Sequence, residues 1–182
     1  MTLLLDKLLI DKTDLADFRE ISSNITAASI NIFIREAQTI NVKTFLGGVT
    51  YKLLLDDYTV NTKTFATQKY TDLFFGSNYT NKRGESVRQN GLAPALIYFS
   101  YSRFLLQHNV NVGRYGVGSL NQDSTETSGS STVRNNSTQA NAMALTYQSE
   151  VGTFLNDQET TYPEWQKKKT HGQKIAAPFF KV

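Results

Sequence analysis

The sequence contains one pair of adjacent carboxylates, Asp56 and Asp57. Paired carboxylates can bind a divalent cation or share a proton, and both arrangements serve catalysis. Here no third ligand follows at a spacing typical of a metal site, and the pair closes a predicted helix next to Tyr58. We therefore interpret the pair as a solvent-exposed turn.

A glycine-rich run extends from Gly113 to Gly118. Phosphate-binding loops are also rich in glycine, but they end in Gly-Lys-Ser or Gly-Lys-Thr and open a helix. This run has neither property. It is interpreted as a β-turn between two extended segments.

The two histidines, His108 and His171, are too few for a multi-histidine metal centre. Cysteine is absent, which excludes disulfides and thiolate chemistry. His108 ends a predicted aromatic helix, where the helix dipole favours a histidine without any catalytic role. Because no GxSxG signature is present either, we predict no enzyme activity, no cofactor and no metal, and a small hydrolase ranks third among the possible functions.

The formal net charge of +3 is unevenly distributed. Residues 167–182 contain five lysines and no acid, whereas the remainder has 14 basic and 16 acidic residues, a net charge of −2. No basic stripe of the kind that reads nucleic acid follows a predicted helix or strand. The longest apolar run is far too short to span a membrane, and the leucine-rich start lacks a cleavage site, so we expect an intracellular protein without membrane contact.

The C-terminal residues are the strongest candidates for binding a partner. Exposed aromatic residues at a terminus are unfavourable in water and useful as anchors in a partner's pocket. The alternative is a solvated arm. The predicted docking residues are Trp165, Lys167, Lys168, Lys169, Lys174, Phe179 and Phe180.

Two loop regions are candidates for contacts between subunits, and are solvent loops if the protein does not assemble. The first is the turn of a predicted β-hairpin over residues 77–90, and the second lies in the glycine-rich run. The residues concerned are Asn81, Lys82, Arg83, Arg114 and Tyr115.

Helical periodicity defines the elements that position these residues. Cap residues and apolar spacing predict helices over residues 25–39, 41–54, 67–75, 91–108 and 133–154, the second capped by Asn41 and interrupted by Gly47 and Gly48. Extended strands are expected over residues 110–120, a long loop over 121–131, and a short strand or an arm packing on a neighbour over 3–10.

The predicted fold class is therefore mainly α: a small bundle of about four to five helices with an inserted β-hairpin and extended terminal arms. Residues 1–166 form the expected domain with its N-terminal arm, and residues 167–182 form a lysine-rich C-terminal arm.

The order of these motifs resembles the head-tail connector proteins, also called adaptor or ring proteins, of tailed bacteriophages, especially those of crAss-like phages. The resemblance covers most of residues 20–165. It rests on the stretch from Ile25 to Glu36-Ala37-Gln38, Val42-Lys43-Thr44-Phe45-Leu46-Gly47, Tyr70-Thr71-Asp72-Leu73-Phe74-Phe75-Gly76, Gly91-Leu92-Ala93-Pro94-Ala95-Leu96-Ile97-Tyr98-Phe99, a late helix over residues 140–154, and Tyr162-Pro163-Glu164-Trp165. The leucine-rich start and the lysine-rich end have no clear counterpart.

The resemblance implies a structural virion protein at the head-tail junction, made in the host cytoplasm. Such a subunit forms a homo-oligomeric ring, commonly of twelve copies, beneath the portal protein and next to other tail or ring proteins. Genome DNA would pass through its lumen, and a body of net charge −2 would not hold the DNA backbone tightly. The alternative is a helical DNA-binding module that uses the basic C-terminal arm.

Overall fold

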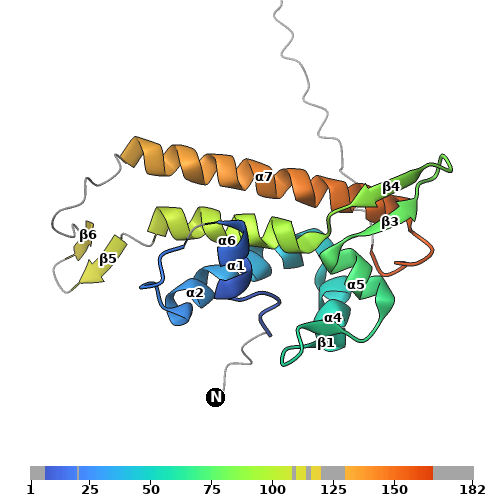
Figure 1. The fold of residues 1–182 in the computed structure, drawn as a ribbon, viewed down its shortest axis with the longest axis horizontal. Coiled ribbons are helices and arrows are strands. Elements are labelled where there is room, and N and C mark those ends of the chain that lie inside the picture. Colours follow the sequence, from blue (N-terminus) through green and yellow to red (C-terminus); the bar gives the residue numbers. More distant parts are fainter. Residues whose placement is uncertain (1–6, 20, 108–109, 114–115, 120–129, 166–182) are drawn as a thin grey trace, which may run out of the picture.

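The computed structural model describes residues 7–19, 21–107, 110–113, 116–119 and 130–165. Two long antiparallel helices, α6 (Leu92–Gln107) and α7 (Ser130–Asp157), lie side by side along the molecule. The shorter helices pack on the other side of α6 from α7 (Figure 1). The predicted class, mainly α with an inserted hairpin, is confirmed.

Helix α6 forms the centre of the core. The sequence is apolar nearly all round, as expected of a buried helix, and Pro94 lies in the first turn, where its missing N–H is tolerated. The helix occupies the predicted position. Its buried residues are Leu92, Pro94, Ala95, Leu96, Ile97, Tyr98, Phe99, Ser100, Ser102 and Phe104.

Helix α7 is longer than predicted, because it begins at Ser130 and ends at Asp157. Its buried face carries small residues where it crosses α6, among them Ala140 and Ala144, and larger ones towards its end, Val151 and Phe154. Small side chains let the two helix backbones approach closely. The residues at the start of α7 are polar, so apolar periodicity does not predict this extension of the helix.

The predicted cap at Asn41 is wrong. Helix α2 (Ala27–Ala37) continues through a π-helical turn, η1 (Gln38–Val42), into α3 (Lys43–Leu46). The Asn41 side chain instead accepts a hydrogen bond from Arg103 of α6 at 2.8 Å. The chain breaks at Gly47, whose φ of 79° suits glycine, and α4 (Gly48–Asp57) follows.

A helix that the polar sequence of this stretch does not predict, α1 (Lys12–Phe18), precedes α2. It has a capping box: the Asp11 carboxylate accepts the backbone N–H groups of Thr13 and Asp14, and the Asp14 carboxylate accepts the N–H of Asp11 at 2.7 Å. Only Leu15 of this helix is buried, so no apolar period marks it. With α1 and the separate α3, the described chain has more helices than the predicted four to five.

A short ladder of β1 (Tyr58–Thr59) and β2 (Thr64–Phe65) joins α4 to α5 (Gln68–Phe75). The predicted helix over residues 67–75 is confirmed, with Thr67 at its N-cap position. The predicted hairpin is also confirmed, as β3 (Ser77–Thr80) paired antiparallel with β4 (Ser86–Gln89).

Two glycines let the hairpin ends pass close to each other. Gly76 and Gly91 both have positive φ, 92° and 80°. A Cβ atom at Gly76 would meet the carbonyl oxygen of Gln89, and one at Gly91 would overlap the carbonyl of Phe74. Glycine is therefore required at both positions by conformation and by space.

The predicted extended pair near the glycine-rich run is present as β5 (Val110–Gly113) and β6 (Gly116–Ser119), paired antiparallel at the far end of α6 (Figure 1). Gly113 faces Gly116 in the ladder, which fits the interpretation as a hairpin. Arg114, Tyr115, His108 and residues 121–129 of the loop predicted over 121–131 lie outside the described residues. The prediction is wrong for residues 130 and 131, which form the start of α7.

Candidate functional site: an apolar groove beside α1

An open groove of about 360 Å³ lies between α1, α5, α6 and α7. Apolar side chains line most of its surface, and two aspartates and a lysine stand at its edge. We call it the α1 groove. Its lining residues are Leu9, Ile10, Asp14, Asp17, Phe18, Lys63, Phe74, Phe75, Asn90, Ala93, Pro94, Ile97 and Tyr147.

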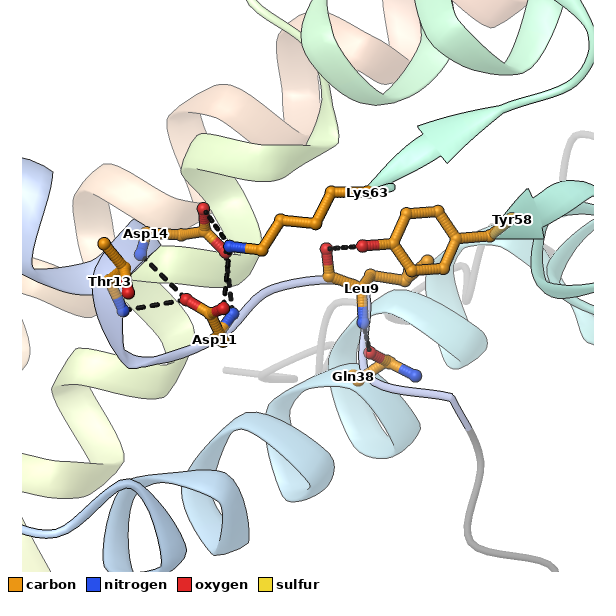
Figure 2. Close-up of polar contacts among 7 residues, drawn as sticks. All are labelled: Leu9, Asp11, Thr13, Asp14, Gln38, Tyr58 and Lys63. Carbon is orange, nitrogen blue, oxygen red and sulfur yellow. Dashed lines mark hydrogen bonds and ion pairs between the residues drawn. The ribbon is translucent and has the colours of Figure 1, made fainter. Parts of the chain in front are cut away.

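The residues just before α1 form one wall of the groove, and buried hydrogen bonds hold them in place (Figure 2). The backbone N–H of Leu9 donates to the side-chain carbonyl of Gln38 at 2.9 Å, and the hydroxyl of Tyr58 donates to the carbonyl of Leu9 at 3.2 Å. Leu9 and Ile10 are buried in the chain's own core. Of the short strand or arm expected over residues 3–10, residues 7–10 thus form neither, and residues 3–6 lie outside the described residues.

Lys63 holds the start of α1 in place by ion pairs with two carboxylates. Its ammonium lies 2.7 Å from Oδ2 of Asp11 and 3.1 Å from both carboxylate oxygens of Asp14 (Figure 2). Lys63 has a positive φ of 52°, an unfavourable backbone conformation for lysine, in the turn between β1 and β2. Lys63 makes its contacts with α1 although this backbone conformation is unfavourable for it.

The charges of this cluster stabilise one another. The hydrogen bond to Asp11 raises the pKa of Lys63, although burial acts against it. Burial would raise the pKa of Asp11, but Lys63 and the N–H groups of Asp14 and Thr13 lower it below its ordinary value. Lys63 and Asp11 are therefore both charged at neutral pH, and the ammonium group of Lys63 is held by the carboxylates of Asp11 and Asp14.

The rim of the groove exposes two aromatic rings and one unpaired acid. Phe18 is 46% exposed and Phe75 is 52% exposed, which is unusual for phenylalanines that are adjacent to a hollow. No described residue forms an ion pair with Asp17, which is exposed on α1. The groove thus offers apolar contact area together with one free negative charge.

Neither Phe18 nor Phe75 was among the residues singled out from the sequence. The groove is assembled from five separate stretches of chain, between Leu9 and Tyr147. The sequence signal that bears on it is weak: Phe75 follows two buried aromatic positions of α5 and lies just before Gly76. Only the packing of α1 against α6 places Phe18 near Phe75.

Another hollow, of about 330 Å³, lies on another side of the α6–α7 pair. We call it the α7 hollow, and it is lined by Phe99, Ser102, Arg103, Leu106, Ser137, Thr138 and Asn141. Consecutive residues of an α-helix are rotated by about 100°, so Ile97 in the α1 groove and Leu106 in the α7 hollow lie about half a turn apart. The two hollows therefore occupy opposite faces of α6.

The outer face of α7 carries no charge over residues 135–149, between Arg134 and Glu150. Its exposed residues there are Asn, Ser, Thr, Gln and Ala, with Met143 37% and Leu145 52% exposed. Depletion of charge with exposed apolar side chains is typical of the centre of protein interfaces rather than of free surface.

The predicted inter-subunit residues of the β3–β4 turn are at the surface. The side-chain amide oxygen of Asn81 accepts the backbone N–H groups of Arg83 and Glu85, which shapes the turn. Lys82 forms an ion pair with Glu159, just after α7, at 2.9 Å, and Arg83 is exposed. The turn is thus tied back to the end of the α6–α7 pair.

Trp165, predicted as a docking anchor, is half-buried in its own chain, with its ring 6.4 Å from the ring of Phe45. The preceding Glu164 forms an ion pair with Lys69 of α5 at 3.1 Å. The remaining predicted docking residues lie outside the described residues. They are Lys167, Lys168, Lys169, Lys174, Phe179 and Phe180.

The adjacent acids have structural partners. Asp56 pairs with Lys52 one helical turn away. The Asp57 carboxylate accepts the N–H of Thr67 at 2.9 Å and its hydroxyl at 2.7 Å, which ties the start of α5 to the end of α4. The predicted solvent-exposed turn is therefore wrong in its conformation, since both acids belong to the end of α4, although Asp56 is exposed as predicted. Within the described ranges no three His, Asp or Glu side chains cluster as metal ligands would, and no helix is long and apolar enough to cross a membrane.

The described chain is thus a small, mainly α protein with surface hollows as its candidate binding sites. A family model matches residues 43–174, more than half of the sequence, and the chain belongs to that family, DUF6712, a family of unknown function. The matched range begins at α3, so it contains α3 to α7 but not α1 or α2. No curated protein and no solved structure matches.

Proposed function

We propose that this protein is a structural subunit of a virion, a head-tail connector that forms a ring beneath the portal and extends the DNA channel. The observation that carries the proposal is the pair of hollows on opposite faces of α6. A closed ring of identical subunits needs heterologous contacts, in which one surface of each subunit meets a different surface of the next. The α1 groove and the α7 hollow provide two such surfaces.

The chemistry of the surface supports the same proposal. The uncharged outer face of α7 is suited to contact with protein. Several cations of the body are neutralised within the chain: Lys63 by Asp11, Lys69 by Glu164 and Lys82 by Glu159. A body with paired cations and a net charge of −2 would hold passing DNA only weakly.

The proposal is tested by reconstitution with the portal protein of the same phage. The purified full-length chain is mixed with assembled portal, and the products are measured by native mass spectrometry and negative-stain microscopy. We expect a closed ring on the portal. Absence of association, together with absence of the protein from purified virions by proteomics, would contradict the proposal.

The alternative function is a DNA-binding module that uses the lysines of residues 167–182. It is distinguished by DNA affinity at low salt, measured by fluorescence anisotropy for the full chain and for a variant with all five lysines changed to glutamine. Tight, salt-dependent binding that the variant loses would favour this alternative. We expect weak binding from both chains.

A further inference from the structure

We infer that the α1 groove receives the C-terminal segment of a neighbouring copy of this chain, with Phe179 and Phe180 in the apolar floor and Lys181 near Asp17. The inference rests on the proposed function, because it names the contact that would link one ring subunit to the next. The acceptor, the α1 groove, is a surface of the described residues, and the donor is the C-terminal segment known from the sequence.

The groove has the chemistry that such a segment needs. Its floor is apolar, from Ile10, Phe74, Ala93 and Ile97, and its rim holds the exposed rings of Phe18 and Phe75. Aromatic side chains dominate the energetics of interfaces because they bury large apolar areas in pockets. The segment Pro178-Phe179-Phe180 supplies two adjacent aromatic anchors.

The charges are complementary. Asp17 lacks an ion-pair partner among the described residues, whereas Lys63 is already held by Asp11 and Asp14. The C-terminal segment contains lysines and no acid after Glu164. A lysine beside the aromatic pair would thus meet a free carboxylate.

The length of the segment allows a contact between copies. The 17 residues that follow Trp165 span at most about 56 Å when extended. A folded chain of this size has a radius of gyration of about 16 Å, so a fully extended segment is long enough to reach a neighbouring copy. Donor segment and acceptor groove are different surfaces, which makes the contact heterologous and able to close a ring.

The test uses the full-length chain with the photo-cross-linker p-benzoylphenylalanine in place of Phe179. This chain is mixed in equal amounts with an unmodified chain labelled with ¹⁵N, irradiated and digested, and the cross-linked peptides are identified by mass spectrometry. We expect cross-links to peptides of α1 or α5 that carry the ¹⁵N label. Cross-links only to the same chain, cross-links only outside the groove, or none between copies would overturn the inference.

A pair of charge reversals makes the test specific. Asp17→Lys, in the groove, is expected to reduce the ¹⁵N cross-links at least about fivefold, and Asp56→Lys, an exposed acid on α4 outside the groove, to leave them unchanged. Circular dichroism confirms that both variants are folded. Equal cross-linking in the two variants would overturn the role of Asp17.

Failure of the inference is distinguishable from failure of the proposed function. A ring on the portal without cross-links in the groove would refute the inference and leave the connector function standing. Cross-links in the groove within open oligomers, without a ring or portal binding, would support the inference and refute the connector function.

Discussion

The hydroxyl groups of Ser102 and Ser137 lie 2.9 Å apart in the contact between α6 and α7, and each is 3.0 Å from the backbone carbonyl of the other residue. Both side chains are buried. This reciprocal arrangement satisfies the two hydroxyls and brings the helix backbones close together. It fixes where α7 lies along α6, and with it the shape of the α7 hollow.

Replacement of Ser137 by alanine is expected to destabilise the fold by about 1–2 kcal/mol, because the hydroxyl and the backbone carbonyl of the buried Ser102 both lose the Ser137 hydroxyl as a partner. Ser149→Ala on the exposed face of the same helix is the matched control, with an expected change within about 0.5 kcal/mol. Urea unfolding followed by circular dichroism measures both. Equal effects would show that the serine pair does not hold the two helices together.

Gly91→Ala is expected to be severely destabilising, by more than about 3 kcal/mol, because the new Cβ would overlap the Phe74 carbonyl at a positive φ. Gly84 has a similar φ of 82° but open space around its Cα, so Gly84→Ala carries only the conformational penalty of about 1 kcal/mol. Thermal unfolding of the two variants separates the contributions. A Gly91 variant as stable as the Gly84 variant would contradict the close approach of the chain ends at Gly76 and Gly91.

Gln38→Leu is expected to cost about 2 kcal/mol. The buried amide accepts the N–H of Leu9 and donates to the carbonyl of Lys7 and the hydroxyl of Tyr51, and a buried donor without a partner is unfavourable. Gln139→Leu, at an exposed position of α7, controls for the gain in apolar character. Hydrogen exchange of the Leu9 amide gives a direct local readout: faster exchange is expected in the Gln38 variant alone, and unchanged exchange would argue against this anchor.

Stability is expected to fall as the pH drops from about 5 to 3. Burial alone would raise the pKa of Glu164, but its own backbone N–H, Lys69 and Tyr70 lower it below the ordinary value. A carboxylate with a lowered pKa stabilises the fold above its unfolded-state pKa, about 4.3 for glutamate, and this contribution is lost as the pH falls through the folded-state pKa.

The corresponding measurement compares melting temperatures at pH 7 and pH 3. Glu164→Gln is expected to narrow the difference in melting temperature between pH 7 and pH 3, because the ion pair with Lys69 is already absent at pH 7. Glu159→Gln, on a side chain that is 63% exposed, is expected to leave the difference nearly unchanged. An unaltered difference in the Glu164 variant would refute the assigned role.

The elements that local signals define were predictable. Helix α5 is bounded by Thr67 and Gly76, and α6 opens at Gly91 and Pro94, so both ends follow from the preferences of single residues. The hairpin between these helices followed from its turn residues. Such signals do not depend on what the element packs against.

The elements that depend on tertiary partners were not predictable. Helix α1 buries only Leu15, and its capping box uses an aspartate where glutamate or glutamine is usual. Asn41 resembled a helix cap because its distant partner, Arg103, cannot be read from neighbouring residues. The groove has the same origin: Phe18, Lys63 and Phe75 line one hollow only after α1, the β1–β2 turn and α5 have packed together.

The central claim, that this chain is a ring-forming connector subunit, is tested most directly by cryo-electron microscopy of the full-length protein bound to the portal of the same phage. We predict a closed ring coaxial with the portal. The uncharged outer face of α7 and the two hollows on opposite faces of α6 should be buried in its protein contacts. A monomeric protein that leaves the portal unoccupied, with these surfaces exposed to solvent, would contradict it.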